Sequence, residues 1–177
     1  MGRAESPERF EGRDVRRALW LSLLSGANAG FGYGAYGIWN WHRQGYDAVW
    51  QHVFGPSPNL QEALGFPEAY NIGLTVELWR RYRLNELEPL ASEKDGQQDY
   101  AWAALGEGRG WIAYCGHPRI LSLPEEAETA RPTVWDLTFR RIWHPRPIRW
   151  DGRVWIDLGT ARGDALLVLE PSSRTKV

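Results

Sequence analysis

Glycine and aromatic residues alternate closely between Gly30 and His42, in a stretch that reads GFGYGAYGIWNWH. Glycine lets a backbone approach a ligand closely and tolerates positive φ. Aromatic rings supply flat apolar faces, and tyrosine and tryptophan add a polar edge. A site that stacks on a sugar ring and bonds its hydroxyl groups needs both, so Tyr33, Trp39 and Trp41 are candidate substrate contacts. A buried strand followed by an aromatic-rich core loop explains the same pattern without a ligand.

His42 follows this aromatic stretch directly, and it either hydrogen-bonds a sugar hydroxyl or sits on a polar loop. The four histidines show no metal-ligand spacing, and no glycine-rich phosphate loop opens a helix after a strand. The sequence therefore predicts neither a metal ion nor a cofactor. The 21 basic residues balance the 22 acidic ones, which argues against a nucleic-acid partner. The single cysteine, Cys115, excludes an intrachain disulfide and reads as a buried, inert thiol.

The first part of the chain reads as a helix, a strand, a loop and a second helix. After a charged loop over residues 1–13, Asp14 is a plausible N-cap for a helix from Val15 to about Ser25. Arg16 and Arg17 lie near that helix start, which disfavours cations. They are either surface residues or held by a carboxylate such as Glu11 or Asp14. The further elements expected are a buried strand at Phe31–Tyr33, short helices at 47–52 and 59–64, and a long helix at Glu68–Tyr82 behind Pro67.

The second part of the chain predicts short strands separated by turn signals. Apolar and polar residues alternate in several of them, and turn sequences such as Asp151-Gly152 lie between. This spacing is typical of an antiparallel β-sandwich. The strands are expected at 100–105, 110–115, 119–123, 134–139, 141–144, 153–158 and 165–169.

The two parts predict an α/β plus all-β chain. A parallel strand needs neighbours on each side and helices over both faces, which one helix–strand–helix unit cannot provide. Residues 1–90 therefore read as the end of a larger α/β barrel whose earlier strands are absent. Residues 91–177 read as an antiparallel β-sandwich.

Several motifs in the first part resemble the apiosidase-like glycoside hydrolases. They are Glu5-Ser-Pro, Phe10-Glu-Gly12, Asp14-Val-Arg-Arg-Ala18, Ser25-Gly-Ala27 and Tyr33-Gly-Ala-Tyr-Gly-Ile-Trp39. In that family a (β/α)8 TIM barrel is followed by an accessory β-sandwich domain. The resemblance therefore implies that residues 1–90 are the last βα units of an incomplete (β/α)8 TIM barrel and that residues 91–177 are the β-sandwich accessory domain. Two departures matter here. The acidic motif is longer by about two residues, and the earlier barrel strands, one of which carries the family's acid/base aspartate, have no counterpart in this sequence.

The resemblance implies roles for the acidic segment. Retaining glycosidases use two carboxyl groups about 5–5.5 Å apart, one as nucleophile and one as acid/base. Glu5 matches the family's nucleophile, Glu11 is a supporting or substrate-contacting residue, and Glu8 replaces Glu5 if the alignment slips. The resemblance also implies that Trp39 forms the floor of a sugar subsite. Otherwise the three glutamates are solvated loop charges, and Trp39 packs in a core.

We expect the C-terminal part of a glycoside hydrolase that acts on plant-type polysaccharide and is inactive alone. One alternative is a non-catalytic carbohydrate-binding or interaction module. Another is a fragment without activity, whose uncovered half-barrel surface self-associates. The expected partner is a carbohydrate, with neither nucleic acid nor membrane. Family members are often secreted or periplasmic, but the first residues do not read as a signal peptide, so we assign no compartment.

Overall fold

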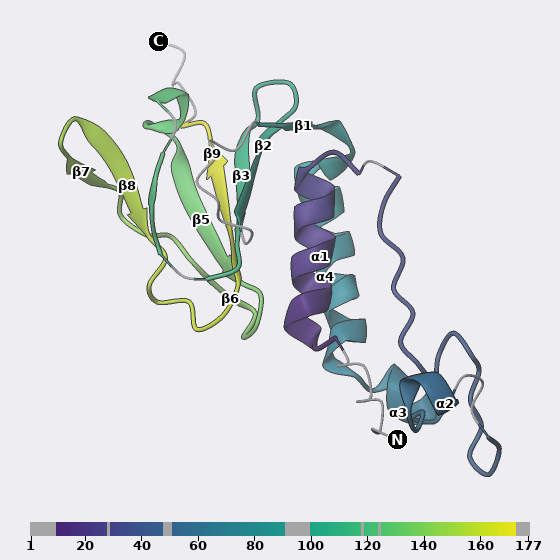
Figure 1. The fold of residues 1–177 in the computed structure, drawn as a ribbon. Helices are drawn as coiled ribbons and strands as arrows, with labels where there is room; N and C mark the ends of the chain where they lie inside the picture. The colour runs from purple at the N-terminus through teal and green to yellow at the C-terminus, as the bar shows by residue number, and fades with distance from the viewer. Residues whose placement is uncertain are drawn as a thin grey trace, which may run out of the picture.

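A computed structural model of the chain describes residues 10–27, 29–47, 51–90, 100–117, 119–123 and 125–172. These residues form three layers, a pair of long helices, a six-stranded sheet and a three-stranded sheet (Figure 1). Every strand pair in the two sheets is antiparallel. The antiparallel β part of the predicted fold is therefore confirmed.

The helices and strands follow the chain in an order close to the predicted one. The helices are α1 (Gly12–Leu24), α2 (Gln51–Phe54), α3 (Leu60–Leu64) and α4 (Pro67–Tyr82), with 3-10 turns at Leu84–Glu86 and Glu125–Ala127. The strands are β1 (Leu87–Pro89), β2 (Tyr100–Leu105), β3 (Gly110–Cys115), β4 (Ile120–Ser122), β5 (Arg131–Asp136), β6 (Arg141–Trp143), β7 (Ile148–Trp150), β8 (Arg153–Asp157) and β9 (Ala165–Glu170). The sheets run β1-β2-β3-β9-β5-β6 and β4-β8-β7. The short strands β1 and β7 had no clear signal in the sequence.

The two long helices begin at favourable residues. Helix α1 starts earlier than predicted, with Glu11 as N-cap, and the Glu11 N–H donates to Asp14 Oδ2 at 2.9 Å. Asp14 therefore stabilises the helix start from within the first turn, where a carboxylate also complements the helix dipole. Helix α4 begins at Pro67, as predicted, because proline at the first helical position loses no hydrogen bond.

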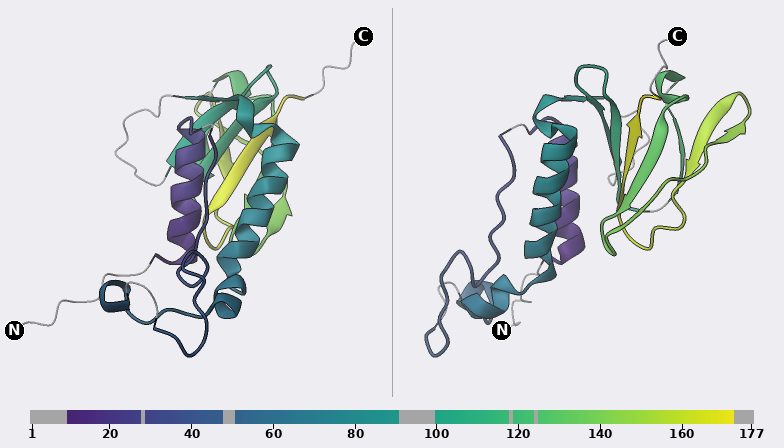
Figure 2. Two further views of the ribbon diagram at one scale, coloured as in Figure 1. Left: turned by 90° about the vertical axis from the view of Figure 1, so that its right-hand side faces the viewer. Right: turned by 180° about the vertical axis from the view of Figure 1, so that it is seen from behind.

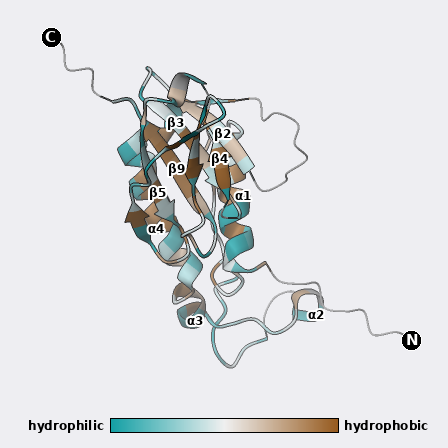
Figure 3. Ribbon diagram, turned by 90° about the vertical axis from the view of Figure 1, so that its left-hand side faces the viewer, coloured by the Kyte–Doolittle hydropathy of each residue, from teal (hydrophilic) through white to brown (hydrophobic). Residues whose placement is uncertain are grey.

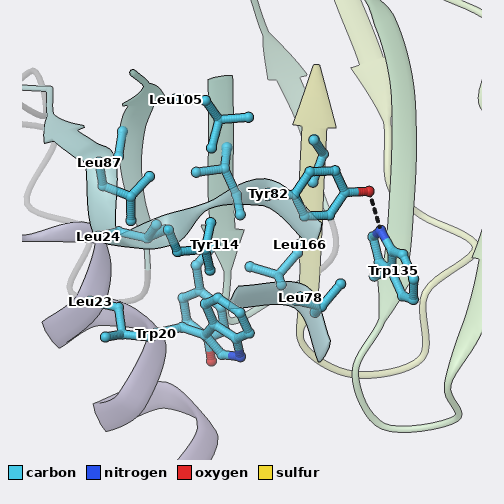
Figure 4. Packing of buried hydrophobic residues seen from close by; sticks show 14 of the residues in the cluster. Trp20, Leu23, Leu24, Leu78, Tyr82, Leu87, Leu105, Tyr114, Trp135 and Leu166 are labelled. Carbon is cyan, nitrogen blue, oxygen red and sulfur yellow. Dashed lines mark hydrogen bonds between the residues drawn. The ribbon is translucent and has the colours of Figure 1, made fainter. Parts of the chain in front are cut away.

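The six-stranded sheet is apolar on both faces. Leu105, Tyr114 and Leu166 face the helices and pack with Trp20 and Leu78 (Figure 4). Alternate residues of the same strands form a second core cluster with the three-stranded sheet, which includes Ala113, Cys115, Leu167, Val154 and Ile156. Hydrophobic residues run along the central strand β9 (Figure 3). Burial raises the pKa of the Cys115 thiol to about 12, in accord with the predicted inert thiol.

The predicted strand at Phe31–Tyr33 is wrong, because residues 29–35 form neither helix nor strand. Phe31 is 38% exposed, and the segment runs from the end of α1 to the opposite end of the helix pair (Figures 1 and 2). A glycine-rich strand loses much backbone entropy on ordering. It also needs neighbouring parallel strands for its hydrogen bonds, and the described residues contain none. The barrel part of the predicted fold is therefore not confirmed.

A buried ion pair ties α1 to the β part of the chain. The Arg16 guanidinium donates to both carboxylate oxygens of Asp164, each at 2.8 Å, and the Asp164 side chain is fully buried. Thr138 Oγ1 and Tyr114 Oη donate to the same carboxylate at 3.1 and 3.4 Å. The interpretation that a carboxylate holds Arg16 is therefore correct, but the partner is neither Glu11 nor Asp14, because Asp164 lies in the loop before β9, far along the chain.

We expect Asp164→Asn to destabilise the protein by about 3–5 kcal/mol, because it leaves the half-buried Arg16 charge without a counter-charge. Urea unfolding measures this loss. Glu128→Gln is the matched control, since it breaks a pair with Arg149 whose guanidinium side chain is 69% exposed. The control should change the free energy of unfolding by less than about 1 kcal/mol. Equal losses of unfolding free energy in the two variants would show that the Arg16–Asp164 ion pair does not stabilise the protein.

Candidate functional site

Residues 35–42 fold into consecutive tight turns that begin the candidate site. The Ile38 N–H donates to the Ala35 carbonyl at 2.8 Å, and the His42 N–H donates to the Gly37 carbonyl at 3.1 Å. The Gly37 N–H donates to Asn40 Oδ1 at 2.7 Å. These bonds fix the backbone that carries the predicted aromatic residues, and we call this segment the aromatic turn.

Gly37 is the one position of this turn where glycine is required by both conformation and space. Its φ is +103°, and an added Cβ would lie 2.7 Å from the Pro58 carbonyl oxygen and 2.9 Å from the Ala63 Cβ. The aromatic turn is therefore seated directly on the segment that leads into α3. Of the glycines in the predicted stretch, Gly37 is therefore the one that allows a close approach, and it approaches the chain itself, whereas Gly30 and Gly32 have open space around them.

Trp39 lies in an open cluster of three aromatic rings. Its indole stacks on Tyr36, with ring centroids 5.5 Å apart and an interplanar angle of 23°. Phe54 of α2 meets Tyr36 edge-on at 5.8 Å. Trp39 and Phe54 are 47% and 44% exposed, so the cluster keeps apolar ring area open to solvent. Exposed, mutually braced rings of this kind can stack on a sugar.

Trp41 is more exposed than Trp39, at 73%, and its backbone is left-handed with φ +47°. Its N–H donates to the Ile38 carbonyl at 3.1 Å. The structure therefore brings the two predicted tryptophans onto one turn and leaves both accessible. The alternative interpretation, a buried aromatic core loop, does not fit these exposures.

The His42 ring holds the loop together. Its Nδ1 lies 3.0 Å from the Pro58 carbonyl oxygen, and its Nε2 lies 2.8 Å from the Tyr46 carbonyl oxygen. Because a carbonyl oxygen only accepts, both nitrogens donate when the ring is charged. These carbonyls, that of Tyr46 foremost, raise the pKa of His42. His42 thus lies on the loop with both ring nitrogens bonded to carbonyl oxygens, while its predicted contact with a sugar hydroxyl stays a prediction.

Of the three acidic candidates, the structure describes only Glu11, which lies where α1 begins. Glu11 is exposed and forms the N-cap of α1, while Glu5 and Glu8 lie outside the described residues. Tyr33 is half-buried, and this burial, followed by the charge of Glu68, raises its pKa. The predicted residues that the structure describes therefore form two groups, Glu11 and Tyr33 beside the helix starts and the other three on the aromatic turn. Both groups lie at the α3 end of the helix pair (Figure 1).

Three residues of this region were not singled out by the sequence analysis. Glu68 places its carboxylate where a Cβ on Gly12 would lie, so this flexible side chain would have to move to admit a larger residue there. Tyr36 stacks three residues before Trp39, a spacing that could have suggested a pair on one turn. Phe54 comes from a separate short helix, and nothing local in the sequence connects it with Tyr36.

The described residues contain no group of three or more histidine, cysteine, aspartate or glutamate side chains arranged to hold a metal ion. None of the described helices combines the length and apolar character needed to span a bilayer.

Comparison with known proteins identifies relatives of this chain. Residues 2–86 match the family model described as the catalytic domain of the apiosidase-like proteins. No curated protein sequence matches the chain. A solved structure named "Glycoside hydrolase" superposes with a TM-score of 0.72 over 96% of this chain, at 15% sequence identity, and the match covers 39% of that structure's chain. This chain therefore spans well under half the length of the protein whose fold it shares, and the resemblance found in the sequence is confirmed.

We expect Gly37→Ala to unseat the aromatic turn, because the added methyl group collides with the Pro58 carbonyl. Gly30→Ala is the matched control, since Gly30 has a similar φ of +100° but open space around its Cβ. The control should lose about 1–2 kcal/mol of stability from the left-handed backbone, and Gly37→Ala about 1–3 kcal/mol more. Thermal unfolding and tryptophan quenching measure the two variants. Equal losses of stability in the two variants would mean that the close approach of Gly37 to Pro58 does not affect the free energy of unfolding.

The raised pKa of His42 predicts a pH dependence. The stabilisation from the charged ring is complete below its unfolded pKa of about 6.5 and is lost as the pH rises through the raised folded pKa. We expect the stability difference between the unaltered protein and His42→Gln to be larger at about pH 5.5 than at about pH 8.5. Urea unfolding at both pH values measures it. A difference that grows with pH would contradict the assignment.

Proposed function

We propose that this chain, whose residues 2–86 match the apiosidase-like catalytic-domain model, forms part of a glycoside hydrolase that acts on plant-type polysaccharide. The observation that carries the proposal is the extent of the family match, which contains both the acidic segment and the aromatic turn. The exposed rings of Trp39 and Trp41 support it, because they offer stacking surface for a sugar. The division into a barrel-derived part, residues 1–90, and a β-sandwich part, residues 91–177, belongs to the same proposal.

The proposed chemistry is hydrolysis of an O-glycosidic bond by two carboxyl groups. Glu5 is assigned as the nucleophile, and Glu11 supports it or contacts the substrate from the start of α1. No aspartate of this sequence matches the acid/base residue that the resemblance implies. We therefore propose that the chain binds saccharide but does not hydrolyse it alone. Its carbohydrate partner would lie over the aromatic turn.

A second candidate function is a non-catalytic carbohydrate-binding module. The specific observation in its favour concerns Glu11, the described residue of the acidic segment. Glu11 serves as the N-cap of α1. Aromatic rings that brace one another at the surface are sufficient for sugar binding without any acid/base pair. Self-association through uncovered apolar surface is a further proposal, which the oligomeric state in solution tests.

We expect neutral plant oligosaccharides to bind the chain and Trp41→Ala to weaken that binding about three- to tenfold, the worth of one aromatic stacking contact. Titration calorimetry measures the affinity. Trp150→Ala is the matched control, since Trp150 is similarly exposed at 68% but lies on β7. Equal affinity in Trp41→Ala and in the unaltered chain would argue against the aromatic turn as the sugar site.

The same samples are assayed for release of aryl leaving groups from a panel of aryl glycosides. No turnover is expected, and Glu5→Gln is the control. Turnover that disappears in Glu5→Gln would mean that the chain assembles a complete active site, and the proposal of saccharide binding without hydrolysis would be wrong.

A further inference from the structure

A groove with a volume of about 480 Å³ lies between α4 and the turn that joins β5 to β6. Tyr70, Gly73 and Glu77 of α4 line one side, and Arg140 of the turn lines the other. Trp135, which is 4% exposed, also contributes to the lining. We propose that this groove binds a carboxylated saccharide, such as a uronic acid unit of an oligosaccharide chain. The inference goes beyond the proposed function, because the groove shares no residue with the aromatic turn.

Two arginines give the groove its charge. The Arg81 guanidinium carbon lies 5.5 Å from the ring centroids of both Tyr82 and Trp135, whose indole N–H donates to Tyr82 Oη at 3.3 Å (Figure 4). A guanidinium held on two aromatic rings is oriented before a ligand arrives. Among the residues that the structure describes, no carboxylate forms an ion pair with Arg81 or Arg140.

The balance of charge favours an anionic ligand. Glu77 is the single acidic residue of the lining, against the two arginines. Arginine presents a planar fork of N–H donors that matches a carboxylate, and such charge-assisted bonds are stronger than neutral ones. The lining therefore carries one more positive than negative charge, and the carboxylate of a uronate would balance it.

Two lining residues go against the preference of their own backbone. Gly73 lies inside α4, where alanine would favour the helix, and an added Cβ would meet no atom within 4 Å. Arg140 has a left-handed φ of +54° in the turn before β6, a conformation that favours glycine or asparagine. Gly73 leaves the groove unobstructed, and Arg140 places a positive charge in its lining. Departures from local preference are expected where function requires them.

The aromatic lining favours a sugar over an acidic peptide. Tyr70 of α4 lines the groove and is 61% exposed, so its ring is accessible to a ligand. A pyranose ring can stack on such a face while its carboxylate reaches the arginines, whereas an acidic peptide uses the charges alone. The volume lies within the range of about 300–1,000 Å³ that is usual for small-molecule sites.

The test is titration calorimetry of the whole chain with a short oligogalacturonate and with its fully methyl-esterified form, which has the same sugar backbone without the charge. The acidic form should bind at least about tenfold more tightly, and its affinity should fall with rising salt. Failure of the acidic form to bind, equal binding of the two forms, or equally tight binding of polyglutamate would each overturn the proposal. Binding of the neutral oligosaccharides at the aromatic turn is measured separately, so failure of one proposal does not mask the other.

Two variants separate a binding defect from a folding defect. Arg140→Gly and Gly73→Gln should each weaken oligogalacturonate binding about tenfold or more. Each should also raise the melting temperature, because each restores the residue type that its backbone prefers. Arg80→Gln is the matched control, since Arg80 is exposed on the same helix outside the groove, and its affinity should be unchanged. Unaltered binding in Arg140→Gly, or an equal loss in Arg80→Gln, would show that the groove is not the site.

Discussion

The six-stranded sheet has two apolar faces, and the rest of the described structure depends on covering both. Ile112 and Tyr114 of β3 point toward the helices, while Ala113 and Cys115 of the same strand point toward the smaller sheet. A sheet of this kind is stable only when another layer lies on each side. Helices α1 and α4 supply one layer and the strands β4, β8 and β7 supply the other.

This arrangement fixes the stretch that matches the family model to the β part of the chain. The buried Arg16–Asp164 pair lies at that junction, with hydrogen bonds from Thr138 and Tyr114 to the same carboxylate. The helices whose starts carry Glu11 and Glu68 are therefore held on the sheet. The residues of the candidate site lie on turns and helix starts at one end of the helix pair, where exposed side chains are tolerated.

The sequence was sufficient for the elements whose patterns are local. Strands β2 and β3 and helix α4 follow from alternation, from helical spacing and from Pro67, and they match the structure within a residue at each end. The sequence did not predict features that depend on residues far away along the chain. The stretch 31–33 has the composition of a buried strand but lacks strands to pair with, and Arg16 finds its carboxylate in a loop near the other end of the chain.

The candidate site was predictable to a similar degree. Trp39 and Trp41 could be selected because glycine and aromatic residues alternate around them. The contribution of Phe54, by contrast, depends on how a separate helix folds back, and the use of both His42 nitrogens depends on where two carbonyls lie. Such contacts are properties of the packed loop, and no spacing in the sequence encodes them.

The position of β9 at the centre of the sheet sets the order in which the molecule can assemble. This strand comes last among the described strands, yet it lies between β3 and β5 and hydrogen-bonds to both. Until it is synthesised, the two halves of the sheet have no bridge, and Leu166 and Val168 are missing from the surface on which α1 packs. Contacts so distant along the chain form slowly. Helix α1 comes first among the described helices and can pack on β2 and β3 early, but the core around Trp20 and Leu24 is complete only after β9 has been synthesised.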